Sequence, residues 1–369
     1  MCPNTNSTSK LSSEVRLLRT LFKLYYKNPD EPLIVPSIEQ REIAIQPLDK
    51  EVMIRHLAFK TIEDLTKFIL QKVPGHIYYS TAYYERPNDP SMEAKGWKGA
   101  DLVFDIDADH LNTQNCEVAK NVGVITVECL EDAVQETLKL IDVLEHEFGI
   151  GKNELRITFS GHRGFHVHVE SDVVKELGQE ERREIVEFLH ARLFDVSRYV
   201  DMKGRFIPAP GMPGIGGRIW RAIEKLLDDK ELQDIKDRTF KLRKLRKAQL
   251  EKLKKLSIEQ ELKINVDEVV TLDVKRLIRI PNSLHGKTGL RVAQVSRLDL
   301  EQGAEHVLKL AIPRNFRKGM LKILFLRKVD APNIMGYTVD VRLDEPVKVP
   351  TFLGIYLIRR GLACLVDES

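Results

Sequence analysis

Asp105 and Asp107 are a pair of residues whose types and spacing suggest chemistry. They lie in the apolar run LVFDIDAD (102–109), which is typical of a buried strand. Residues two apart in a strand project from one face, about 6.6 Å apart, so the carboxylates lie together, opposite Phe104 and Ile106. Burying such a pair without a partner is costly, and Mg²⁺ or Mn²⁺ is the natural compensation because both prefer oxygen ligands. The alternative is a pair of surface aspartates at a strand end.

The segment SGHRGFHVH (160–168) combines a glycine-flanked turn with polar donors. Its two glycines permit a tight hairpin turn and close approach of an anion to the backbone. Ser160, Arg163 and His166 offer donors suited to phosphate oxygens. Two alternatives remain open: a metal pair formed by His166 and His168 on one strand face, and a plain hairpin with polar edge residues.

A third cluster, DVKRLIRIPNSLHGKTG (273–289), contains one acid and several basic residues. Asp273 is a candidate third carboxylate for the cation site, and Arg279, His285 and Lys287 are candidate phosphate contacts. The Gly-Lys-Thr within it is not a P-loop, because Pro281 stands where that motif requires glycine. The alternative is an ordinary basic strand and turn.

His110, Cys116 and Cys129 raise the question of a zinc site. Three nitrogen and sulfur ligands within twenty residues fit one side of such a site, but a tetrahedral structural site needs a fourth. No other cysteine or histidine occurs between 111 and 145, and His146 follows further on. Two buried free cysteines are the alternative interpretation.

Hydrophobic periodicity predicts the elements that position these residues. Strands are expected at 41–46, 53–59, 77–85, 100–108, 155–160, 165–170, within 269–281, and near 322–329 and 337–343; helices are expected at 14–26, 61–73, 131–148 and 352–362. The stretch 172–262 is helical and charged, with a Pro/Gly-rich loop at 208–217. The predicted fold class is therefore α/β (α+β), with a core of mixed strands and a helical insertion.

Length and composition exclude several classes of protein. The chain has 369 residues, of which 43% are hydrophobic, so it is not disordered as a whole, and it has neither a membrane-length apolar run nor a secretory signal. Its net charge is only +3, but 236–255 contains ten Lys or Arg and two acids. That basic stretch is either a solvated helix face or a contact to a nucleic-acid backbone through residues such as Lys244, Arg246 and Lys247.

With these clusters in order, the chain resembles the catalytic small subunit of archaeo-eukaryotic DNA primase, in its archaeal form. The resemblance covers about 41–365 and rests on KGWKGADLVFDIDADH, FSGHRGFHVHV and LDVKRLIRIPNSLHGKTGL. It implies an RRM-like catalytic sheet and a nucleotidyltransferase that makes short primers on single-stranded DNA from nucleoside triphosphates. It also implies a cytoplasmic, nucleoid-associated protein, independent of membranes, in a heterodimer with the iron–sulfur large primase subunit.

The resemblance also implies roles for particular residues. Asp105, Asp107 and Asp273 match the family's catalytic carboxylates, which hold Mg²⁺ or Mn²⁺. The positions that match its nucleotide-binding residues are Ser160, His162, Arg163, His166, Arg279 and His285, with Arg55 a looser match to a basic active-site position. The family places a zinc knob after the aspartates, here 108–130, but Thr126 stands where one of its cysteines is expected.

The domain organisation expected from these patterns is a disordered polar tail at 1–12 and one catalytic domain at 13–369, with the helical insertion at about 172–262. A metal-dependent nuclease would use the same acidic strand, and a non-catalytic replisome subunit would retain the same fold. A metal-dependent nuclease needs no triphosphate contacts, and a non-catalytic DNA-binding subunit of the replisome needs no catalytic carboxylates. Both are alternatives to the primase interpretation.

Overall fold

The computed structural model describes residues 7–192, 208, 211–212, 214–236, 262–329, 334–338 and 341–366. Its helices are α1 (Ser7–Lys27), α2 (Ile62–Lys72), α3 (Gln114–Val122), α4 (Val127–His146), α5 (Asp172–Lys175), α6 (Gln179–Leu189), α7 (Gly214–Leu226), α8 (Asp229–Lys236), α11 (Glu268–Leu272), α12 (Arg297–Glu301), α13 (Ala304–Ala311), α14 (Arg314–Arg317) and α15 (Thr351–Arg359). Its strands are β1 (Ile43–Pro47), β2 (Ile54–Leu57), β3 (Pro74–Ser80), β4 (Ala82–Tyr84), β5 (Trp97–Ala100), β6 (Leu102–Asp107), β7 (Leu155–Phe159), β8 (Gly164–Val169), β9 (Leu277–Arg279), β10 (Gln294–Val295), β11 (Met320–Phe325), β12 (Val347–Pro350) and β13 (Ala363–Leu365).

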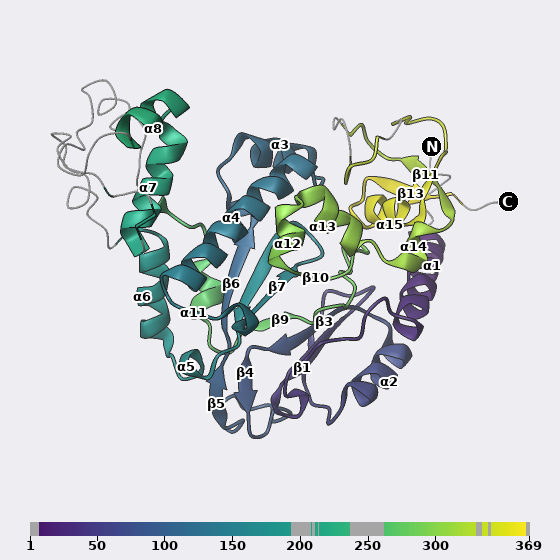
Figure 1. Cartoon of the computed structure of the whole chain (residues 1–369). Coiled ribbons are helices and arrows are strands. Elements are labelled where there is room, and N and C mark those ends of the chain that lie inside the picture. Colours follow the sequence, from purple (N-terminus) through teal and green to yellow (C-terminus); the bar gives the residue numbers. More distant parts are fainter. Residues whose placement is uncertain are drawn as a thin grey trace.

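The sheet that carries the acidic strand has the order β10–β7–β8–β6, and all its neighbouring strands are antiparallel. From β6 the chain crosses through α3 and α4 to β7, so β8 lies between two strands joined by a crossover. This split β-α-β arrangement is the core of an RRM-like sheet. α4 packs against β6 and β8 (Figure 1). The predicted mixed α/β class is confirmed.

A second four-stranded antiparallel sheet, β2–β1–β3–β9, lies beside the first (Figure 1). One continuous apolar core includes residues of both sheets, among them Ile45 and Ile77 from the second and Phe104 and Val167 from the first. Since the two sheets share this core, the side chains at their junction have fixed relative positions.

Smaller units complete the fold. A three-stranded sheet, β12–β11–β13, packs against α15, and β4 pairs with β5. In the helical insertion, α7 buries Ile219, Trp220 and Ile223 in a separate small apolar cluster. None of the described helices is both long and apolar enough to span a bilayer.

The structure corrects one strand prediction near the site. Residues 268–272 form the helix α11, although the β-branched VVTL favours a strand. The reason is the N-cap Asp267, whose carboxylate accepts hydrogen bonds from Val269 N at 2.9 Å and Val270 N at 3.4 Å. These bonds satisfy amide groups that a short helix leaves without partners.

Other boundaries differ in smaller ways. α1 begins at Ser7, so half of the segment predicted as a tail is helical. The described part of 337–343 holds no strand, because a turn with positive φ at Met335 and Gly336 pairs Ile334 directly with Tyr337. Most of the basic stretch, including Lys244, Arg246 and Lys247, lies outside the described residues.

Candidate active site

Strand β6 presents the two aspartates on one face, as its alternation predicts. Phe104 and Ile106 are fully buried on the other face, whereas Asp105 and Asp107 are half-buried. Asp105 lies opposite His166 and Asp107 opposite Gly164 in the pairing with β8. The acidic strand and the hairpin therefore meet in adjacent strands.

The carboxylate of Asp105 lies in a strongly unfavourable electrostatic environment. The pKa of Asp105 is raised from 3.8 to about 7. Burial is the largest cause, and the charges of Asp107 and Asp267 also raise the pKa, whereas Arg279 and Arg276 lower it. Asp267 caps α11 and donates its backbone N–H to Asp105 O at 2.8 Å. Sequence reasoning missed Asp267, because only the turn before α11 brings it to β6. A cluster of carboxylates at this position fits a bound cation.

A cavity of about 410 Å³ contains several of the predicted residues. Its lining includes Asp105, Asp273, His166, Arg279 and Arg55, together with Met53, Tyr78, Val270, Lys275, Arg276, Leu277 and Ile278. Asp273 is exposed, at the C-terminal end of α11, where its carboxylate accepts a hydrogen bond from Lys275 N at 2.9 Å. The third cluster of the sequence therefore contributes both acid and base to one cavity.

Arg55 is held in the cavity wall by a buried acid. Its guanidinium donates to both carboxylate oxygens of Glu42, at 2.9 and 3.3 Å. Glu42 is fully buried, and burial alone would raise its pKa, but the hydrogen bonds from Arg55 and His56 N and the charge of Lys95 lower it overall. The looser match at Arg55 thus lines the same cavity as Asp105, oriented by an ion pair with Glu42, the residue that precedes β1.

Asp107 lies just outside the lining of that cavity. Its Oδ1 accepts a hydrogen bond from Asp109 N at 3.0 Å and is 3.6 Å from Arg163 Nε. Arg163 also forms an ion pair with Asp109. In this structure the arginine expected to contact phosphate therefore pairs with the carboxylates at the end of β6.

Ser160 shapes the turn between β7 and β8. Its Oγ accepts hydrogen bonds from His162 N and Gly164 N, each at 3.3 Å. Gly161 has a φ of +75°, and a Cβ there would lie 2.8 Å from His285 Cβ. Both the left-handed backbone and the close approach require glycine, so the turn packs directly on His285.

Histidines from three segments meet behind this turn. The rings of His162 and His285 stack at 5.1 Å between centroids, and His76 contacts His285 edge-on at 4.7 Å. Burial, followed by nearby basic side chains, lowers the pKa of His162 to about 2 and that of His76 to about 3, and lowers the pKa of His285 well below its usual value. All three are therefore neutral at pH 7. Arg279 Nε lies 3.5 Å from His76 Nδ1 and links this cluster to the cavity.

Arg360, beyond the end of α15, is a further neighbour that sequence reasoning did not assign. Its guanidinium donates to Gly123 O at 2.9 and 3.3 Å and lies 3.3 Å from His162 Nε2. Because arginine only donates, His162 Nε2 accepts and the proton of the neutral ring lies on Nδ1. The run LIRRG (357–361) gave a compositional signal for a basic residue, but not its target.

His166 and His168 lie on the same strand face but in different environments. His166 Nε2 is 3.7 Å from Asp105 Oδ1, and burial followed by Arg279, Arg276 and Arg156 lowers the pKa of His166 to about 3. His166 is therefore neutral beside Asp105 at pH 7. His168 is buried and contacts Tyr79 Oη at 3.4 Å. The two histidines are thus divided between the cavity and the interior.

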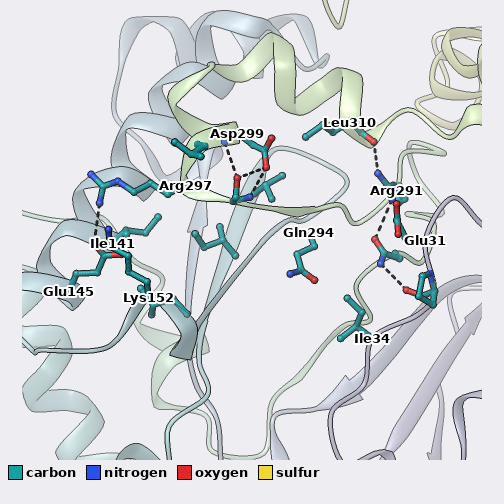
Figure 2. A pocket seen from close by; sticks show the side chains of 17 residues that line it. Glu31, Ile34, Ile141, Glu145, Lys152, Arg291, Gln294, Arg297, Asp299 and Leu310 are labelled. Atoms are coloured by element: carbon teal, nitrogen blue, oxygen red, sulfur yellow. Dashed lines mark hydrogen bonds and ion pairs between the residues drawn. The ribbon is translucent and has the colours of Figure 1, made fainter.

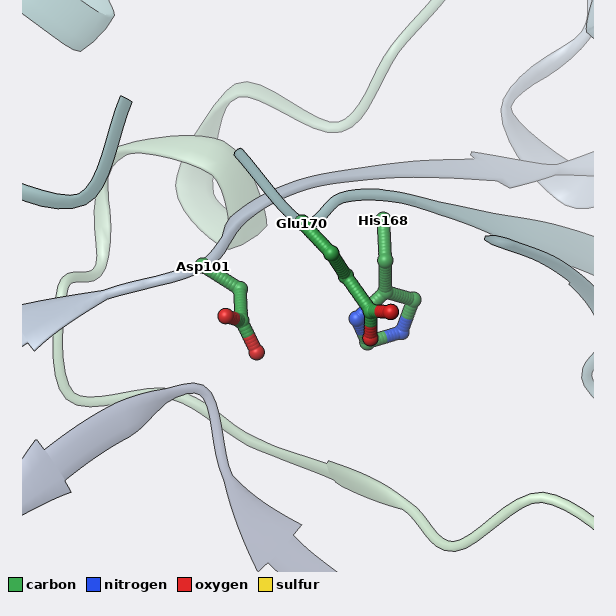
Figure 3. Close-up of side chains that lie close together, drawn as sticks. All are labelled: Asp101, His168 and Glu170. Atoms are coloured by element: carbon green, nitrogen blue, oxygen red, sulfur yellow. The ribbon is translucent and has the colours of Figure 1, made fainter. Parts of the chain in front are cut away.

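His168 belongs to a cluster with Asp101 and Glu170, whose ligand atoms lie within 4.8 Å of one another, a spacing that fits a metal ion (Figure 3). Each carboxylate already has a guanidinium partner. Asp101 is bonded to Arg41 at 2.7 Å, and Glu170 to Arg156. These charges balance without a cation, so the cluster serves as an internal ion network.

The chain is similar in sequence to a known protein family. The model of the family described as "DNA primase small subunit" matches residues 104–297. The small subunit PriS of Pyrobaculum islandicum is 39% identical over 351 residues, covering 95% of this chain and all of that protein. The chain belongs to the DNA primase small subunit family. It is accordingly the catalytic subunit of a DNA primase, a nucleotidyltransferase of DNA replication.

Two further primase small subunits have comparable coverage. That of Archaeoglobus fulgidus is 37% identical, covering 93% of this chain and 96% of its own, and that of Saccharolobus solfataricus is 30% identical, covering 95% of both chains. The solved polymerase domain of Mycobacterium tuberculosis ligase D matches 80% of this chain and 87% of its own, at 11% identity. Its TM-score of 0.37 is too low to support an argument.

The zinc knob that the primase family implies does not fit this chain. Cys116 and Cys129 form a disulfide, so they are neither thiolate ligands nor the free cysteines of the alternative interpretation. His110 lies on the surface, after β6. The predicted set of His110, Cys116 and Cys129 is therefore corrected to a covalent cross-link.

A larger cavity in this primase subunit, of about 920 Å³, lies elsewhere (Figure 2). It is lined by residues from α4, β7, β10, α12 and the segment after α1, and none of the predicted site residues lines it. Its Arg297 is paired with Asp142, Glu145 and Glu301 at 2.8–3.3 Å. The larger of the two cavities therefore does not contain the candidate carboxylates.

Proposed function

We propose that the 410 Å³ cavity and the adjoining end of β6 form the polymerisation site, in which Asp105, Asp107 and Asp273 hold Mg²⁺ or Mn²⁺ for primer synthesis on single-stranded DNA. The observation that carries this proposal is that Asp105 and Asp273 line one cavity together with three arginines. Burial and the nearby Asp107 and Asp267 raise the pKa of Asp105, in keeping with this geometry. Oxygen donors with excess negative charge match these hard cations. When bound, such cations lower the pKa of a hydroxyl nucleophile and stabilise the pentavalent phosphate.

The basic residues supply the complementary charge for a nucleoside triphosphate. Arg55, Arg276 and Arg279 line the same cavity as the carboxylates. Arg163 does not line this cavity, and its guanidinium is paired with Asp107 and Asp109. Guanidinium groups that are held in position before the reaction stabilise the negative charge that develops on the phosphates as the bond to the leaving group breaks. We assign Arg163, whose guanidinium is shared between Asp107 and Asp109, to the same phosphate-binding role.

The hairpin contributes neutral donors. The Ser160 oxygen accepts hydrogen bonds from two backbone amides of the turn, so its hydroxyl proton remains available as a donor. His162 carries its proton on Nδ1, and His285 packs against the turn. We assign these groups, with His166, to holding the triphosphate in line for attack by a 3′-hydroxyl.

The test is primer synthesis on single-stranded DNA with labelled nucleotides and Mg²⁺ or Mn²⁺. Asp105→Asn and Asp273→Asn should abolish template-dependent products. Asp172→Asn is the matched control and should leave activity intact, because Asp172 is exposed and its ion-pair partner among the described residues is Lys175. Full activity in folded Asp105→Asn protein would refute the assignment. Loss of DNA without added nucleotides would instead support a nuclease.

We also propose that the chain acts as a heterodimer with a primase large subunit, as the words "small subunit" in the relatives' names suggest. Co-expression followed by size-exclusion chromatography tests this, and the expected result is a 1:1 complex with higher primer yield than the chain alone. Separate elution at micromolar concentration, with unchanged yield, would contradict it.

A further inference from the structure

Two Thr-x-x-Cys segments begin the consecutive helices α3 and α4. Thr113 caps α3, and its hydroxyl oxygen accepts a hydrogen bond from Cys116 N at 3.2 Å. Thr126 caps α4 in the same way, accepting from Cys129 N at 3.3 Å. Each cysteine is therefore the third residue of its helix, held by a threonine cap.

The disulfide joins these two helix starts. Cys116 is 1% exposed and Cys129 is 6% exposed, and both pack within the main apolar core. The sequence separation of 13 residues closes a loop that contains α3 from Cys116 to its end and the first three residues of α4. A covalent bond here restricts the segment between Cys116 and Cys129, chiefly by limiting the unfolded chain.

The same four positions have the pattern of a structural zinc site. Cysteines at all of them would read C-x₂-C-x₉-C-x₂-C, two ligand pairs at helix starts. Here two of the four are threonine caps, so only two sulfurs are present. His146 cannot complete the set, because it lies at the far end of α4, about 25 Å along the helix from Cys129.

The cross-link also lies next to the catalytic strand. Cys129, Asp109 and Arg163 line one cavity of only about 10 Å³. Such a volume holds at most about one water molecule, so these groups are close-packed. The helix starts thus support the ion pair that fixes Arg163 beside Asp107.

We propose that the Cys116–Cys129 disulfide replaces a zinc ion as the cross-link of this segment, and that the chain folds around its catalytic strand without zinc. Thr113 and Thr126 occupy the two remaining ligand positions as helix caps. This inference concerns the composition and stability of the chain, so its test does not depend on polymerase activity.

The first experiment uses the purified full-length chain without variants. Trypsin cleaves after Lys98, Lys120 and Lys139, which places Cys116 in peptide 99–120 and Cys129 in peptide 121–139. Mass spectrometry of the alkylated, unreduced digest should show these peptides joined, and dithiothreitol should separate them into two thiol peptides while itself forming a cyclic disulfide. Elemental analysis should find far less than one zinc per chain. Free thiols together with one zinc per chain would overturn the proposal.

The second experiment tests the four positions. Thr113→Cys with Thr126→Cys, kept reduced, should bind one Zn²⁺ per chain and give the absorption of tetrahedral thiolate-bound Co²⁺. Thr113→Ser with Thr126→Ser keeps the caps and should bind neither ion. Failure of the folded four-cysteine protein to bind metal would show that these four positions are not arranged to hold zinc. Cys116→Ala with Cys129→Ala should lower the melting temperature of the chain, and an unchanged melting temperature would contradict the role as a cross-link.

Discussion

Replacement of Asp105 by asparagine should stabilise the metal-free protein while abolishing its activity. Asparagine keeps nearly the same shape and removes the charge that burial, Asp107 and Asp267 oppose. Active sites commonly hold such unfavourable groups because function needs them. The prediction therefore tests directly whether the carboxylates repel one another before a cation binds.

The magnitude follows from the pKa of Asp105, raised from 3.8 to about 7. Because the folded state binds this proton more tightly than the unfolded state, the carboxyl lowers stability progressively as pH rises from 3.8 to 7. At 1.36 kcal/mol per pH unit, the full loss is about 4 kcal/mol above pH 7. The advantage of Asp105→Asn should grow by about 2–3 kcal/mol between pH 5 and pH 8.

Guanidinium chloride unfolding at pH 5, 6, 7 and 8 in EDTA measures this difference. Asp299→Asn is a control of opposite sign. Burial raises the pKa of Asp299, but hydrogen bonds from Ser296 and His306 lower it overall, so its removal should destabilise the protein at pH 8. Manganese added at pH 8 should stabilise the wild type more than Asp105→Asn. The reasoning fails if the stability difference between Asp105→Asn and wild type is the same at pH 5 and pH 8.

Three further substitutions test the contact between β6 and β8, the interior ion pair of Asp101 and the contact of Arg360 with His162. Gly164→Ala places a Cβ 2.2 Å from a carbonyl oxygen of β6, so we expect a lower melting temperature by circular dichroism and loss of primer synthesis; an unchanged melting temperature would contradict the close strand contact. Arg41→Met leaves Asp101 buried without its guanidinium and should cost about 3–5 kcal/mol in equilibrium unfolding, partly restored by adding Asp101→Asn. If restoration is absent, the ion pair is not the cause. Arg360→Gln should raise the KM for nucleotide with little change in melting temperature, since Arg360 orients His162, and an unchanged KM would remove Arg360 from the site.

The local features of the site could be predicted because they depend on short-range geometry. Strand alternation placed Asp105 and Asp107 on one face, and Phe104 and Ile106 in the core. The turn was predictable for a similar reason, because the two glycines around His162 and Arg163 are a local signal for a hairpin. The motif order also sufficed to indicate the family.

The partners of these residues could not be predicted, because they come from distant segments. Asp267 reaches Asp105 only because its cap turns the β-branched VVTL segment into α11, where local propensity favours a strand. His76 meets His285 through the packing of two segments more than two hundred residues apart.

By itself, the sequence determined which side chains are candidates for chemistry and which face of each strand carries them, since both follow from residue type and a two-residue repeat. Only the tertiary structure decided what charge each group feels. The raised pKa of Asp105 and the neutral state of His162 arise from burial and from neighbours that other elements supply. The disulfide in place of a zinc site has the same origin, because the approach of two helix starts determines whether Cys116 and Cys129 bind a metal or each other.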